Sequence, residues 1–166
     1  MNRLYIILFI TVIFLFIMPK IQVDDSYILM RYADNFKVGN GLVWNTGEYL
    51  QSYTGILMLS LYIISPLPYL VTAYIVGIVS FLLGGWFLCL LLKNSPVLNL
   101  ILIIYAISPI AYLHIFSGLE TILFTTISLS SIYFWRGKMK WLLLVSLILL
   151  FLTRPEGVLL SVLLII

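Results

Sequence analysis

Long apolar stretches separated by short polar segments form most of this sequence. A helix needs about 20 apolar residues to cross the hydrocarbon core of a bilayer, and residues 69–92 reach that length. Shorter stretches can be completed by flanking side chains that extend to the interface, whereas residues 53–64 are too short to cross. The pattern predicts an all-α polytopic membrane protein, a transmembrane helix bundle with spans at residues 4–19, 69–92, 97–113, 119–135, 141–153 and 158–166.

Composition supports a membrane protein and argues against two other classes. Of the 166 residues, 63% are hydrophobic and 9% are charged, whereas soluble domains carry about 25% charged residues. That shortfall leaves too little polar surface for a water-soluble globule. The net charge is +3, but the basic residues are scattered between apolar stretches, so we expect no nucleic-acid partner.

The N-terminal stretch, MNRLYIILFITVIFLFIMPK, has the basic start and apolar run of a signal peptide. No small-residue cleavage motif follows it, so we favour an uncleaved first span. The loop that begins at Lys20 then lies on the opposite side of the membrane from the N-terminus.

The distribution of charge orients the predicted spans. If residues 53–64 do not cross, one face carries basic residues and no acidic ones, and every acidic residue lies on the other face. These basic residues are Arg3, Lys93, Arg136, Lys138 and Lys140, and the acidic residues are Asp24, Asp25, Asp34, Glu48, Glu120 and Glu156. Cytoplasmic loops are enriched in Lys and Arg. We therefore expect a cytoplasmic N-terminus and a long extracytoplasmic loop over residues 20–68, in which residues 53–64 form an interfacial helix.

No charged residue lies in the middle of a predicted span. Ion-coupled transporters usually carry ionisable groups at that depth, so the pattern argues against a pump. Any chemistry is expected at the outer surface.

The segment DDSYILMRYADNF predicts a short helix that begins at an acidic cap. An aspartate at the N-cap accepts hydrogen bonds from free backbone N–H groups and suits the positive end of the helix. Asp24 and Asp25 cannot both cap well, so one of them is free to face a substrate. The following VGNGLVWNTGE is typical of a loop with turns.

Two later polar segments also allow alternative interpretations. In HIFSGLETILF, Ser117 and Glu120 have the spacing of a capping box, and His114 fits an interfacial position better than a metal site. In LTRPEGVLL, a turn is expected at the outer surface. Arg154 either pairs with Glu156 there or binds a phosphate, for which a guanidinium is well shaped.

Four segments in this order, DDSYILMRYADNFKVGNGLVWNTGE, QSYTGILM, SGLETILF and TRPEGVLL, together resemble the GT-C class of membrane glycosyltransferases. The likeness is closest to the bacterial family that includes the mycobacterial terminal arabinofuranosyltransferases. It is more distant to the protein O-mannosyltransferases and the lipid A aminoarabinose transferase. The resemblance covers nearly the whole chain and implies sugar transfer from a polyprenyl-phosphate donor to a glycan, lipid or protein acceptor at the outer face of a bacterial plasma membrane.

The resemblance also implies roles for individual residues. Asp24, or Asp25 as the second choice, corresponds to the catalytic base of the first outer loop. Glu120 corresponds to the acidic residue of the next outer loop, and we expect it to bind substrate with His114, Arg154 and Glu156. Some members bind a divalent cation near these acids.

Members of this class are longer, so we expect the chain to be the N-terminal part of such an enzyme. Two alternatives stay open. One is a non-catalytic lipid-binding or flippase-like protein, and the other is a structural membrane subunit.

Overall fold

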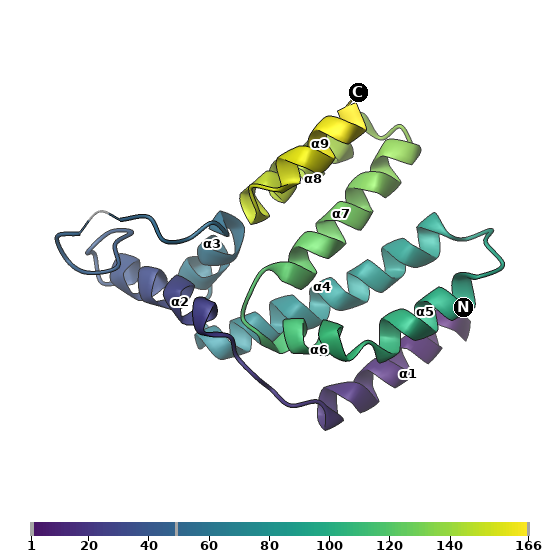
Figure 1. Ribbon diagram of the computed structural model, residues 1–166, viewed down its shortest axis with the longest axis horizontal. Helices are drawn as coiled ribbons and strands as arrows, with labels where there is room; N and C mark the ends of the chain where they lie inside the picture. Colours follow the sequence, from purple (N-terminus) through teal and green to yellow (C-terminus); the bar gives the residue numbers. More distant parts are fainter. Residues whose placement is uncertain (1, 49, 166) are drawn as a thin grey trace.

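The structure is a computed structural model that describes the backbone of residues 2–48 and 50–165, with side chains from Phe9 onward. Nine helices and no strand form this described part of the chain (Figure 1). They are α1 (Asn2–Ile17), α2 (Asp24–Lys37), α3 (Ile56–Ile64), α4 (Tyr69–Leu91), α5 (Leu98–Ile107), α6 (Pro109–Phe116), α7 (Thr121–Arg136), α8 (Lys140–Thr153) and α9 (Gly157–Ile165). The prediction of an all-helical protein is confirmed.

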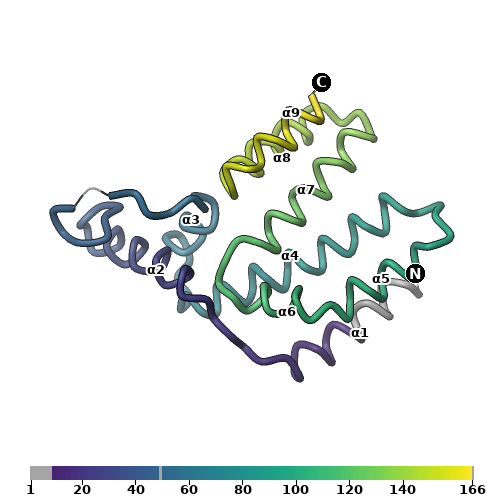
Figure 2. The backbone as a smooth tube through the Cα atoms, in the orientation of Figure 1, coloured from purple at the N-terminus to yellow at the C-terminus, as the bar shows by residue number. Residues whose placement is uncertain are grey.

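Helices α4 and α7 form the centre of the arrangement. They pack against each other, α7 then packs against α8, and α8 forms a hairpin with α9. The backbone trace shows α1 beside α5 on one side of α4, and α2 with α3 and the long loop at one end (Figure 2). The turn between α8 and α9 therefore lies near α3, although it is far from it in sequence.

Small residues bring α4 close to its neighbours. A Cβ added at Gly77 would lie 2.3 Å from the backbone oxygen of Ile115 in α6, and one at Gly84 would lie 2.6 Å from the hydroxyl of Tyr105 in α5. The Thr126 hydroxyl of α7 donates to the Ser80 carbonyl at 2.6 Å. Small residues that let backbones approach in this way are typical of helix packing in membranes.

Two helices cover the predicted span over residues 97–113. α5 ends at Ile107, and α6 begins at Pro109 with a bend of 51° between them. Pro109 cannot donate the backbone hydrogen bond that a continuous helix needs, and it disfavours helical geometry at Ser108. Ser108 instead caps α6 by accepting from Ala111.

Helix α2 buries one face against α3. The buried positions Ser26, Leu29, Met30 and Ala33 recur with helical spacing. The three apolar ones form a cluster with Met58, Leu59 and Tyr62 of α3. The other end of α2 is held to α4, because the Tyr69 hydroxyl donates to Asp34 at 2.7 Å.

Helix α4, with 23 residues, is the one described helix that is by itself long and apolar enough to cross a membrane. The bent pair α5 and α6 passes the same test only if it is taken as one span.

Candidate active site

A cavity of about 320 Å³ lies where α2 begins, where α3 and α7 begin, and where α8 turns into α9. Four of the residues expected at a site line it, namely Asp25, Glu120, Arg154 and Glu156. The remaining lining residues are Ile28, Leu29, Ser52, Tyr53, Thr54, Gly55 and Leu119. Three carboxylates and one guanidinium from three separate parts of the chain therefore share one cavity.

Arg154 is held by α7. Its Nε donates to Glu120 Oε1 at 2.9 Å, and its Nη2 donates to the Thr121 hydroxyl at 3.0 Å. The guanidinium carbon also lies 6.0 Å from the centre of the Phe124 ring. The structure thus pairs Arg154 with Glu120 rather than with Glu156. The buried carboxylate of Glu120 needs a cation, whereas the exposed Glu156 can be solvated by water.

The predicted capping box at Ser117 and Glu120 is wrong. Glu120 is the N-cap of α7 and makes no side-chain capping bond. Ser117 lies too early to cap, and its hydroxyl donates to the His114 carbonyl at 3.0 Å. The Glu120 carboxylate binds Arg154 instead of reaching back to the Ser117 backbone, because Gly118, at φ +79°, turns the chain between them.

The turn over residues 117–120 is fixed to both α2 and α3. The Val23 backbone N–H donates to the Ser117 carbonyl at 3.2 Å, and the Tyr62 hydroxyl donates to the Gly118 carbonyl at 2.7 Å. A Cβ at Gly118 would lie 2.7 Å from Ser26 Cβ, so glycine allows this close contact. Burial, together with the negative charge of Glu120, raises the pKa of Tyr62 above its ordinary value, so its hydroxyl keeps its proton at neutral pH.

The predicted acidic cap of α2 is also wrong. The N-cap position is Val23, which makes no side-chain capping bond, and Ser26 donates its hydroxyl to the Val23 carbonyl at 2.7 Å. Asp24 and Asp25 both belong to the first turn, where a negative charge suits the helix dipole. Of the two exposed side chains, Asp25 lines the cavity and Asp24 is not among its lining residues.

His114 does not join this site. It lies in α6, it is not a lining residue of the cavity, and its Nδ1 is buried with no hydrogen-bond partner in the described part of the chain. No group of three or more His, Cys, Asp or Glu among the described residues is placed to hold a metal ion. The divalent cation expected from the resemblance stays a prediction.

Sequence reasoning assigned no role to Ser52, Thr54, Gly55 or Thr121. The first three precede α3 and line the cavity, and Thr121 binds Arg154. The polar segment QSYTG, directly before an apolar stretch, could have indicated that Ser52, Thr54 and Gly55 lie at a site.

Comparisons of the chain with known protein families, with curated proteins and with solved structures find no match. The glycosyltransferase resemblance therefore rests on the four segments alone. Three of these segments contribute the charged residues of the cavity, and QSYTG of the fourth contributes polar ones.

Proposed function

We propose that this chain is the catalytic membrane part of a glycosyltransferase that moves a sugar from a polyprenyl-phosphate donor to an acceptor hydroxyl. The single observation that carries this proposal is the cavity that joins Asp25, Glu120, Arg154 and Glu156. It offers carboxylates for a hydroxyl proton and for sugar hydroxyls, beside a cation for a phosphate.

Exposed apolar surface supports a membrane location for the bundle. Only 28% of the most apolar 18 residues of α4 are buried, which is unlike the core helix of a soluble protein. Large side chains on other helices are also exposed, including Phe16 at 87% and Trp141 at 80%. Soluble monomers rarely expose contiguous patches of this kind. We infer a multi-pass protein of a bacterial plasma membrane, with the cavity at the outer face and the N-terminus in the cytoplasm.

Arg154 is suited to receive the leaving phosphate. A guanidinium has five N–H donors, and Glu120 and Thr121 accept two hydrogen bonds from it. The side chain is 31% exposed, so further donors can reach a ligand in the cavity. Glu120 holds the guanidinium in place, which lowers the entropy cost of binding an anion.

Asp25 is the base that the cavity favours, and Asp24 is the base that the resemblance implies. In the proposed step the carboxylate takes the proton of the acceptor hydroxyl. The acceptor oxygen then forms a bond to the anomeric carbon, and the bond from that carbon to the phosphate oxygen breaks. The polyprenyl phosphate leaves with the electron pair, beside Arg154. Glu120 is committed to its ion pair, and Glu156 remains to bind sugar hydroxyls.

The test is sugar transfer by the full protein in lipid nanodiscs, with a radiolabelled polyprenyl-phosphate sugar and an acceptor glycan. Asp25→Asn should lower the transfer rate by about 10²–10⁴ while donor binding is retained. Glu48→Gln is the matched control. Glu48 is an exposed acid of the same predicted outer loop, residues 20–68; its carboxylate accepts a hydrogen bond from Asn45, and it does not line the cavity.

Asp24→Asn separates the two bases. A large loss in this variant, with normal transfer by Asp25→Asn, would move the role to Asp24. A wild-type protein that binds the donor and transfers nothing would overturn the proposal in favour of a lipid-binding or flippase-like protein.

A further inference from the structure

A second cavity lies at the basic end of the bundle, away from the site already described. It has a volume of about 590 Å³, and its lining comes from the end of α4, the residues after it and the end of α7. The lining residues are Leu90, Leu91, Leu92, Lys93, Asn94, Ser95, Tyr133, Arg136 and Gly137. It therefore contains two cations and no carboxylate.

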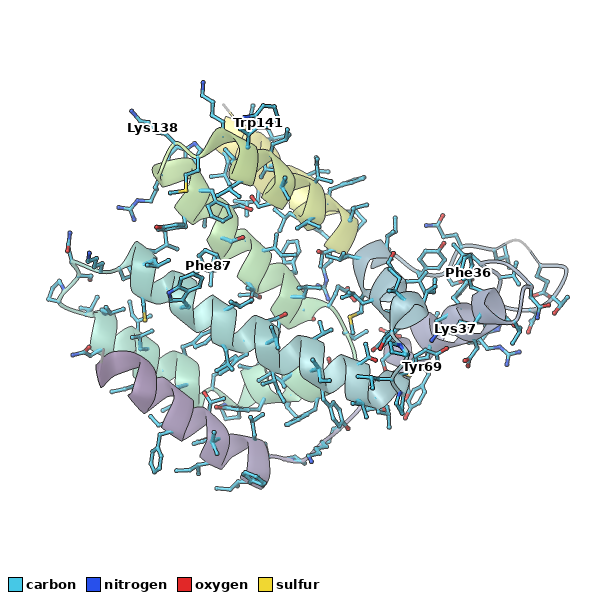
Figure 3. The ribbon with its side chains drawn as sticks, turned by 180° about the vertical axis from the view of Figure 1, so that it is seen from behind. Phe36, Lys37, Tyr69, Phe87, Lys138 and Trp141 are labelled. Atoms are coloured by element: carbon cyan, nitrogen blue, oxygen red, sulfur yellow. The ribbon has the colours of Figure 1, made fainter. Side chains whose placement is uncertain are left out.

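The charges of this cavity are not neutralised by the protein. Lys93 is exposed and has no hydrogen-bond or ion-pair partner among the described residues, and Arg136 donates only to the Leu91 carbonyl, at 3.2 Å. Lys138 and Lys140 follow directly in the chain. Figure 3 shows Lys138 and Trp141 at the end of the molecule where α7 turns into α8. An anion is the ligand that such a cavity would attract.

A groove of about 230 Å³ lies on the same side of the bundle. Its floor is α7, and its walls are α4 and α8. Ser80, Leu83 and Phe87 line it from α4, and Leu142, Val145 and Leu149 line it from α8. Figure 3 shows Phe87 on α4 at this level.

The surface of the groove is apolar although it contains hydroxyl groups. Thr126, Ser130 and Ser146 all line it, and each donates its hydroxyl to a backbone carbonyl. The wall residues Leu83, Leu142 and Val145 remain 41–52% exposed. The groove therefore presents an apolar surface to any molecule that binds over it.

Groove and basic cavity follow one face of each helix. Within α4 the lining positions run 80, 83, 87 and 90, with 91 beside the last, and within α7 they run 123, 126, 130 and 133, with 127, 134 and 136 beside them; Lys93 and Asn94 follow the end of α4. These intervals of three and four keep a single helical face. From Ser80 to Leu91, where α4 ends, the face is about 16 Å long, which matches the half-thickness of a hydrocarbon core, about 15 Å.

We propose that this face binds one anionic phospholipid, with its phosphodiester between Lys93 and Arg136 and an acyl chain in the groove. The combination of a cationic cavity and an apolar groove of single-leaflet length matches that ligand, and basic pockets between membrane helices favour anionic headgroups. The site rests on the proposed membrane location, and it is separate from the sugar-transfer cavity.

The test measures binding of phosphatidylglycerol to the full protein in a neutral detergent, by native mass spectrometry and by the melting temperature. Wild type should bind one phosphatidylglycerol and melt at a higher temperature with it than with phosphatidylcholine. Lys93→Gln with Arg136→Gln should weaken binding about 30-fold. Lys138→Gln with Lys140→Gln is the matched control, because it removes equal charge at the same end and outside the cavity, and it should bind normally.

Two further arms keep the result interpretable. If the double variant does not fold, Lys93→Gln alone should weaken binding about fivefold, because this exposed side chain has no bond to lose. Asp25→Asn should bind phosphatidylglycerol like wild type, so loss of sugar transfer and loss of the lipid site are distinguishable.

Several results would overturn the proposal. Equal binding of phosphatidylcholine would remove the role of the cations, and equal weakening in the control variant would show diffuse attraction. Equal stabilisation by inorganic phosphate or glycerol phosphate would show a free-anion site with no need of the groove. A dimer that binds no lipid would assign the groove to a second copy of the chain.

Discussion

Gly55 lies directly against the carboxylate of Glu120, so that a Cβ added at Gly55 would sit 2.9 Å from Oε2. Glu120 cannot move away without disturbing its bond to Arg154. Gly55→Ala should therefore destabilise the fold by about 1–3 kcal/mol, the usual cost of overpacking, as measured by unfolding in neutral detergent. Gly137→Ala is the control, because there the added Cβ meets the flexible end of Met139 at 3.2 Å. Equal stability of the two variants would mean that Glu120 relaxes freely.

Removing the charge of Arg154 should lower the free energy of unfolding more than removing the charge of Glu120, although the two residues form one ion pair. Glu120 is 7% exposed and Arg154 is 31% exposed. Arg154→Gln leaves a buried carboxylate without its cation, whereas Glu120→Gln leaves a cation that water can reach. We expect a loss of about 1–3 kcal/mol for Glu120→Gln and a larger loss for Arg154→Gln.

A double-mutant cycle measures the same coupling. The combined variant should lose less than the sum of the two single losses, because the residues are in contact. Additive losses would show that the pair contributes nothing to stability.

The hydrogen bond from the Tyr62 hydroxyl to the Gly118 carbonyl should make the stability of the protein depend on pH. Tyr62→Phe removes a buried hydrogen bond of 2.7 Å and should cost about 1 kcal/mol at neutral pH. Because burial and the negative charge of Glu120 raise the folded pKa of Tyr62 above its ordinary value of 10.0, the folded state holds this proton more tightly than the unfolded state. Its contribution is then fully present below pH 10 and is lost as the pH rises through the folded pKa.

Melting temperatures measured between pH 7 and about pH 11 check this sign. Wild type should lose stability above pH 10, and Tyr62→Phe should show a shallower decline. An identical decline in both proteins would assign the effect to other groups.

Helix α3 should leave both of its flanks on one side of the membrane. Its nine residues span about 14 Å as a helix, which is half of the hydrocarbon core. In a background with Cys89→Ser, cysteines at Ser52 and Leu67 should both react with an impermeant reagent added from outside the cell. A cysteine at Lys93 is the control and should react only after the cells are opened. Labelling of Leu67→Cys from the inside alone would mean that α3 crosses and that the orientation of everything after it is inverted.

The turn at Arg154 and the acidic helix at Asp24 and Asp25 could be predicted from the sequence, because Pro, Gly and a break in hydrophobicity mark such places locally. The ion-pair partner of Arg154 could not be predicted from the sequence. Glu156 lies only two residues from Arg154 in the chain, whereas Glu120 becomes the partner because packing buries it. The same limit applies to the cap of α7, where Ser117 and Glu120 have the right spacing and Gly118 turns the chain so that no capping bond forms.

The break between α5 and α6 was visible in the sequence as Pro109 and was outweighed by the continuous apolar pattern around it. Length and hydrophobicity cannot distinguish a bent pair from one span, since both keep the same total of apolar residues. The proximity of Gly55 to Glu120 has no local signal, because it depends on how α3 meets α7.

The order of the cavity residues along the chain has a consequence for synthesis. Its lining runs from Asp25 to Glu156, and ribosomes add about 5–20 residues per second, so the last wall is made about 7–26 seconds after the first. Until then Glu120 has no guanidinium beside it, and the α8–α9 turn that closes the cavity does not exist. A nascent chain therefore has its acidic helix before the cavity is complete. The full lining of the cavity is present only after Arg154 and Glu156 have been added to the chain.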